Sequence, residues 1–162
     1  MTTTELIHMM QVEGERFKPG FWHDVDLKDY ASKLLNRAEI RFHYSEGNCQ
    51  GFIAYYCNDK ESRCGYISLV LVAHTAQGTG LAGELLEHVI DAMERRKFTR
   101  VRLQVDHDNP RAINFYKRHG FELVDARNDM WTMERKLSST MGKAENTPHG
   151  TSVGEQRLQV PG

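Results

Sequence analysis

The feature that most constrains this chain is a pair of closely spaced glycines between an apolar run and an amphipathic one. Residues 66–72 are apolar and rich in β-branched side chains, which predicts a strand covered on both faces. Residues 81–95 carry apolar side chains on one helical face and charged ones on the other, which predicts a long helix. Gly78 and Gly80 lie between them, where the lack of Cβ atoms lets the backbone curl around an anion. The unpaired amides at the helix start make this junction a candidate phosphate site.

The glycines alone leave two interpretations open, a phosphate-binding turn and a tight strand-to-helix turn that binds nothing. No Lys-Ser or Lys-Thr pair follows Gly80, so the signature of a triphosphate-binding loop is missing. The third glycine of a dinucleotide-binding turn is missing as well. Nucleoside triphosphates and NAD are therefore not expected ligands.

The residues after the long helix continue the alternation of strands and helices. Residues 100–106 alternate apolar and polar side chains, which predicts a strand with one drier face. Asn109 can cap a second helix, Pro110 fits its first turn, and Gly120 ends it. Two closing strands are predicted at 121–124 and 130–134.

The N-terminal part predicts two helices and then two strands. The first helix is expected at 6–17 and ends at Pro19 and Gly20, and Asp26 starts the second. The two strands are expected at 40–44 and 51–56, joined by a hairpin turn. The predicted order is helix, helix, three strands, helix, strand, helix, two strands.

Two separate motifs resemble those of the GNAT family of N-acetyltransferases. Residues 77–82, Gln-Gly-Thr-Gly-Leu-Ala, match its Gln/Arg-x-x-Gly-x-Gly/Ala signature. Its Asn-x-x-Ala-x-x-Phe-Tyr-x-x-x-Gly-Phe segment is matched by Asn109, Ala112, Phe115, Tyr116, Gly120 and Phe121. The resemblance covers residues 65–137 and implies the GNAT acyl-CoA N-acyltransferase fold, an α/β (layered α+β) architecture with a central mixed, mostly antiparallel sheet flanked by helices. Family members usually begin with a strand, and we find none before the first helix.

The resemblance implies acetyl-CoA as co-substrate and an acyltransferase that transfers groups other than aminoacyl groups. The pyrophosphate would be held by main-chain amides of the glycine turn, and the pantetheine would pair with the end of the preceding strand. Asn109 would contact the CoA arm, although its pattern fits a helix cap equally well. The expected cofactor-binding residues are Leu71, Val72, Ala73, Gln77, Gly78, Thr79, Gly80, Leu81, Ala82, Asn109 and Tyr116.

Direct acyl transfer to an amine needs a neutral amine, a group that stabilises the developing oxyanion, and a proton for the leaving thiolate. Tyr116 matches the family's general acid. Many relatives carry a Glu as base on the strand before the glycines, but this strand offers only Tyr66 and Ser68 as polar side chains, so they are candidates for a water-mediated base. A strand amide near 70–72 would donate to the oxyanion. Other candidate bases, each also interpretable as a solvated surface group, are Asp24, His43, Asp59 and Glu61.

The acceptor is expected between the N-terminal helices and the strand that carries Tyr55. Its candidate contacts are Phe21, Trp22, Tyr30, Tyr55 and Asp59, of which the aromatic ones could equally be packing residues. The N-terminal segment and residues 57–61 resemble those of bacterial small-molecule acetyltransferases encoded with surface-polysaccharide genes. This resemblance implies a nucleotide-linked amino sugar as the leading acceptor, followed by another small amine. A peptide or protein amine is the alternative acceptor. A catalytically degenerate acyl-CoA sensor is the alternative function, because the strand carboxylate is missing.

Composition sets the remaining expectations. The chain has 162 residues, with 21 Lys and Arg against 22 Asp and Glu, so nucleic acid and membrane surfaces are not expected partners. One domain is predicted at 1–137, as a monomer or homodimer, and a disordered tail at 138–162. Three cysteines without metal-ligand spacing fit a reduced cytoplasm, and Asp106-His107-Asp108 is interpreted as a polar loop, so no metal is predicted.

Overall fold

The computed structural model describes residues 1–138. The predicted disordered tail falls almost entirely outside these residues, so it stays a prediction, as does the single domain at 1–137. No helix among residues 1–138 is long and apolar enough to cross a membrane. Cys49, Cys57 and Cys64 are free thiols.

The chain begins with two helices, α1 (Thr3–Phe17) and α2 (Leu27–Arg37). The Thr2 side chain accepts from the Glu5 amide at 3.1 Å, and the Glu5 carboxylate accepts from the Thr2 amide at 2.8 Å. This reciprocal cap starts α1 at Thr3, three residues earlier than predicted. The prediction depended on apolar spacing, and the first turn of α1 has no apolar residue before Leu6. Asp26 caps α2 as predicted.

Six strands form one sheet in the order β1-β2-β3-β4-β6-β5. The β3–β4 pair is parallel and all other pairs are antiparallel, which confirms the predicted mixed, mostly antiparallel sheet. Several strands are longer than predicted. Polar residues at their ends pair with the neighbouring strand, although the apolar alternation used for the prediction stops before them. The strands are β1 (Glu39–Ser45), β2 (Asn48–Tyr56), β3 (Cys64–Val72), β4 (Arg100–Asp106), β5 (Glu122–Asp125) and β6 (Met130–Lys136).

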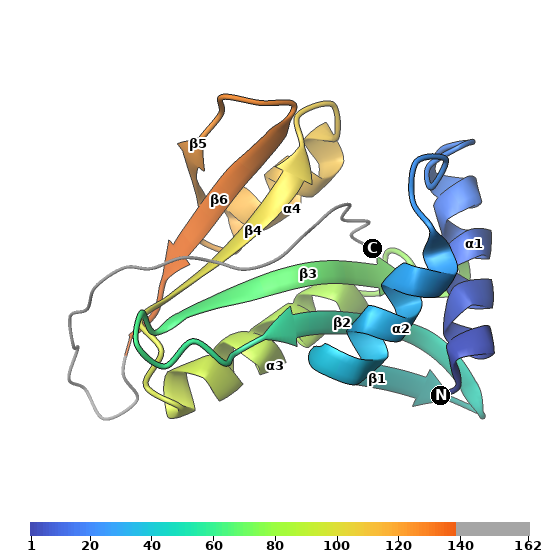
Figure 1. The fold of residues 1–162 in the computed structure, drawn as a ribbon, viewed down its shortest axis with the longest axis horizontal. Helices are drawn as coiled ribbons and strands as arrows, with labels where there is room; N and C mark the ends of the chain where they lie inside the picture. The colour runs from blue at the N-terminus through green and yellow to red at the C-terminus, as the bar shows by residue number, and fades with distance from the viewer. Residues whose placement is uncertain (139–162) are drawn as a thin grey trace.

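Helices cover the two faces of this sheet. On one face, α1 and α2 pack on alternate residues of the central strands, such as Phe52, Leu69 and Leu71. On the other face, α3 (Leu81–Arg95) and α4 (Pro110–Arg118) pack on the intervening residues, such as Ile53 and Val70. Figure 1 shows α2 crossing in front of the sheet and α3 behind it. All nine residues of β3 are buried, which confirms the strand predicted to be covered on both faces. The predicted order of elements is confirmed, including the start with helices.

The parallel strands β3 and β4 diverge toward their C-terminal ends. Their pairing ends at Ile67 and Leu103, although β3 continues to Val72 and β4 to Asp106. In Figure 1 the two strands start at one corner and separate along their length. The divergence leaves the β4-facing edge of the last part of β3 open, so an extended, amide-bearing molecule can pair with it.

Candidate active site

The glycine turn lies at the end of β3, beside the opening between β3 and β4. After Val72 the chain forms a short 3₁₀ helix, η1 (His74–Ala76), which the sequence pattern did not reveal. Gly78 and Gly80 then adopt φ angles of +83° and +89°, in the left-handed region. A Cβ atom built at either glycine would meet no atom within 4 Å, so open space lies beside the turn.

The start of α3 leaves main-chain donors available. Gly80 is its N-cap and makes no side-chain capping hydrogen bond. The Glu84 amide, which donates to the Gly80 carbonyl at 3.0 Å, begins the helical hydrogen bonds. The amides that precede Glu84 therefore face the exposed turn without a capping side chain, and with the positive end of the helix dipole they favour an anion there.

Helix α4 carries the two residues of the second motif. The Asn109 side chain accepts from the Ala112 amide at 3.1 Å, which confirms its capping role. Tyr116 is fully buried, with ring centroids 5.1 Å from Phe115 and 5.5 Å from Phe121. Burial, with a smaller contribution from nearby Tyr66, raises the pKa of Tyr116 well above its usual value. The phenol therefore holds its proton more tightly than an exposed tyrosine does and is in the protonated form that a general acid requires.

Ser68 marks the point where β3 leaves β4. Ala54 pairs with Leu69 and Tyr55 with Ile67, so Ser68 is the extra residue of a β-bulge. Its side chain is buried, and its hydroxyl lies 3.2 Å from the Tyr30 hydroxyl of α2. The structure thus brings one predicted base candidate together with one predicted acceptor contact.

The remaining predicted acceptor contacts fall into two groups. Phe21, Trp22 and Tyr30 form a chain of rings with centroid distances of 4.9 and 6.1 Å. Within it, Trp22 is buried, and its indole N–H donates to the Met10 carbonyl at 2.7 Å. Tyr55 belongs to the cluster on the α3 face, and Asp59 follows β2 near the N-terminal start of β3. The structure therefore does not bring these two residues to the ring chain.

The other base candidates lie apart from the bulge. Asp24 is exposed and 3.1 Å from the exposed His23, and Glu61 is exposed in the connection between β2 and β3. His43 is exposed on β1, at the edge of the sheet.

A cavity of about 410 Å³ lies between the α1–α2 connection and the end of β4. Asp106 and Asp108 line it, although the sequence led us to interpret them as part of a polar loop and not as acceptor contacts. The signal was available, because Asp106 follows the polar positions of β4, whereas Val101, Leu103 and Val105 are buried on the α3 face. Its lining also includes Phe17, Lys18, Phe21, His23 and Asn109.

Asp106, His107 and Asp108 are also a group that could hold a cation. Their ligand atoms lie within 4.8 Å of one another. Asp106 already accepts from the Asp108 amide at 2.8 Å, and the His107 ring lies 3.4 Å from Asp108 and 3.6 Å from Asp129. Asp108 is exposed, and exposed acidic groups of this kind are common without a bound ion. The prediction of no metal stays a prediction.

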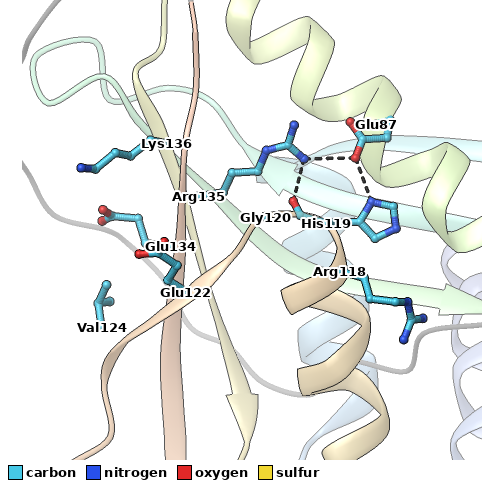
Figure 2. Close-up of a pocket in the computed structure, with 9 residues that line it drawn as sticks. All are labelled: Glu87, Arg118, His119, Gly120, Glu122, Val124, Glu134, Arg135 and Lys136. Carbon is cyan, nitrogen blue, oxygen red and sulfur yellow. Dashed lines mark hydrogen bonds and ion pairs between the residues drawn. The ribbon is translucent and has the colours of Figure 1, made fainter.

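A second cavity, of about 440 Å³, lies where α3, α4 and β6 meet (Figure 2). Glu87 accepts from the His119 ring at 2.8 Å and from Arg135 at 3.1 Å, and Arg135 also donates to the His119 carbonyl. Partial burial opposes ionisation of Glu87, yet these hydrogen bonds hold its pKa below the usual value. The network ties the end of α4, which follows Tyr116, to α3 and β6.

Most of the described chain matches one known protein family. The family described as acetyltransferase (GNAT) matches residues 7–121. The chain belongs to this family. The match confirms the resemblance seen in the two motifs, whereas the bacterial small-molecule type stays a prediction.

Two curated relatives of this GNAT chain are acetyltransferases by name. N-alpha-acetyltransferase 30 of Saccharomyces cerevisiae is 37% identical over 57 residues, which are 35% of this chain and 32% of that protein. The match thus spans about a third of that relative's length. The 5-NmdU N-acetyltransferase of Pseudomonas phage PaMx11 is 31% identical over 106 residues, 60% of this chain and 71% of that protein.

A solved structure shows the same GNAT fold. The PaiA N-acetyltransferase of Thermoplasma acidophilum, solved in complex with coenzyme A, superposes with a TM-score of 0.68 over 83% of this chain and 92% of that chain. The identity is 13%, so the likeness is one of fold.

Proposed function

We propose that this protein is an acetyl-CoA-dependent N-acetyltransferase that transfers an acetyl group directly to a primary amine. The observation that carries the proposal is the exposed turn at Gly78 and Gly80, placed at the end of β3 where β3 and β4 separate. The turn offers main-chain donors and open space for a diphosphate, and the open edge of β3 suits the two amides of a pantetheine arm. Membership of the GNAT family and a neighbour solved with coenzyme A support this use.

The reaction requires one bond to form and one to break. The amine nitrogen bonds to the acetyl carbon, and the bond from that carbon to sulfur breaks. We assign the proton of the departing sulfur to the Tyr116 hydroxyl, whose raised pKa keeps it protonated. Main-chain amides of β3 near the bulge would donate to the acetyl oxygen as negative charge develops on it.

The acceptor amine must lose a proton before or during attack. Ser68 is too weak a base to remove it alone, but its hydroxyl, 3.2 Å from that of Tyr30, can position a water molecule. Tyr66 is the other candidate for this water-mediated role. Asp106, Asp108 and His23 line the neighbouring cavity and are groups that can take up the proton there.

The cavity supports a small amine as acceptor. Asp106 and Asp108 attract an ammonium group, and the rings of Phe17 and Phe21 offer apolar surface beside them. Lys18 is the lining residue that would attract an anion. Two carboxylates oppose the diphosphate of a nucleotide-linked sugar, so a free amino sugar or another small amine fits better.

The proposal is tested by thiol release from acetyl-CoA with four acceptors, a free amino sugar, a nucleotide-linked amino sugar, an alkyl diamine and a short peptide. Calorimetry with CoA is run in parallel. We expect CoA binding and turnover with the amino sugar or the diamine. Turnover with the peptide alone would favour the peptide acceptor, CoA binding without turnover would favour the acyl-CoA sensor, and no CoA binding would overturn the proposal.

A further inference from the structure

Glu13, on α1, is the only acidic side chain in the buried set of residues 1–138, with 6% of its surface exposed. A carboxylate taken out of water loses several kcal/mol of hydration unless hydrogen bonds replace it. The partners of Glu13 therefore indicate what it does.

Both oxygens of this carboxylate face one residue, His74, 61 positions along the chain. Oε1 accepts from the His74 main-chain N–H at 2.9 Å, and Oε2 lies 3.2 Å from His74 Nδ1. His74 is the first residue of η1, between the end of β3 and the glycine turn. The contact thus ties α1 to the segment that leads into the turn.

Ala76 of this segment packs in the core, but few hydrogen bonds tie the segment to the rest of residues 1–138. The Ala73 amide donates to the Gln50 carbonyl of β2 at 2.8 Å, and the Thr75 hydroxyl donates to the Gln50 side chain at 3.2 Å. The main-chain bonds donated by Ala76, Gln77 and Thr79 go to carbonyls of the segment itself. Besides the Gln77 side chain, which donates to the Val72 carbonyl of β3 at 3.4 Å, Gln50 and Glu13 are the hydrogen-bonding partners outside the segment in residues 1–138.

We infer that Glu13 is a positioning residue for the diphosphate-binding turn. By fixing the His74 amide it holds the following glycines in the conformation that presents their N–H groups, so less ordering is needed when CoA binds. The same carboxylate connects the segment proposed to bind CoA to α1. The last residue of α1, Phe17, lines the cavity proposed for the acceptor. The inference rests on the proposed use of the glycine turn for CoA.

Calorimetry with CoA on the wild type, Glu13→Ala and Gln11→Ala tests the inference. Gln11 is an exposed residue of the same helix and of similar size, so its truncation controls for changes in α1. We expect Glu13→Ala to raise the Kd for CoA about tenfold, the equivalent of losing one charge-assisted hydrogen bond, and Gln11→Ala to leave it unchanged. Thermal unfolding of each variant confirms that binding is measured on folded protein.

Glu13→Gln separates this role from simple packing. Its carboxamide oxygen can still accept from the His74 amide, so we expect it to recover most of the affinity that Glu13→Ala loses. If the glutamine variant binds as weakly as the alanine variant, the hydrogen bond is not what positions the turn, and the inference fails.

Amide hydrogen exchange tests the Glu13–His74 hydrogen bond in the wild-type protein, without any substitution. We expect the His74 amide to exchange much more slowly than that of its neighbour Thr75. Equal exchange rates, or equal CoA affinity of Glu13→Ala and the wild type, would overturn the inference while leaving the proposed function standing. A wild type that does not bind CoA would overturn both.

Discussion

At the scale of single residues, Tyr116 joins an ordinary packing role to a chemical one. It is fully buried between Phe115 and Phe121, as a core residue would be. It also lies near Tyr66 of β3, which pairs with Arg102 of β4 one residue before the two strands separate. A sulfur atom delivered along the open edge of β3 would reach the phenol from inside the molecule, where bulk water does not compete for its proton.

Replacing Tyr116 by Phe keeps the ring and removes the proton donor. We expect kcat to fall about a hundredfold or more, because general acid catalysis contributes on that order, while the Kd for CoA changes less than about threefold. Steady-state kinetics and calorimetry on the same preparation measure both quantities. Unchanged kcat would remove Tyr116 from the acid role.

The pH dependence follows from the same burial. Because burial raises the pKa of Tyr116, the phenol retains its proton as the pH rises past the range in which an exposed tyrosine would lose it. We therefore expect kcat to rise with pH as the acceptor ammonium deprotonates, and to show no fall up to about pH 9.5. A kcat profile that declines between about pH 7 and pH 9 would contradict this assignment of the acid.

At the scale of elements, the glycine turn joins β3 to α3 and is the part of the site that needs a special backbone. Gly78 and Gly80 both adopt positive φ angles, and neither is crowded, so close packing does not require them. Two properties therefore explain the glycines at these positions: the left-handed backbone conformation and the open space beside the turn, which a ligand can occupy.

A pair of alanine variants separates these two effects. Gly47, in the β1–β2 hairpin, has a φ of +81° and is equally uncrowded, so Gly47→Ala and Gly80→Ala carry similar backbone strain. We expect each to lower the free energy of unfolding by about 1 kcal/mol. Gly80→Ala alone should weaken CoA binding, by tenfold or more, because its methyl group occupies the anion's space. Equal CoA affinity of the two variants, measured by calorimetry, would argue against diphosphate binding at the turn.

The elements themselves were largely predictable because local signals define them. The apolar run of β3, the cap at Asn109 and the glycines before α3 each depend on neighbours in sequence. The bulge at Ser68 was not predictable, since it depends on the register between β2 and β3. The position where β3 and β4 stop pairing and the 3₁₀ helix η1 were not predictable either, because they too depend on tertiary contacts.

At the scale of the whole molecule, the site forms where the two layers of helices meet the open part of the sheet. α3 and α4 supply the turn and the phenol from one face, and the α1–α2 connection supplies aromatic rings from the other. Sequence reasoning could not assign Tyr55 and Phe21 to opposite faces, because alternation along a strand says which residues share a face but not which helices cover it. The alternation of β4 places Asp106 on the face opposite Val105, but it does not reveal that the α1–α2 connection covers that face.

The central claim is that the turn at the start of α3 binds the diphosphate of coenzyme A through main-chain amides and so brings the thioester to Tyr116. Titration of the isotope-labelled protein with CoA, followed through its amide resonances, measures this directly. We predict saturable shifts that are largest for the amides of residues 78–82 and extend along residues 68–73 of β3. No shift at millimolar CoA, or shifts confined to residues outside these two segments, would contradict the account.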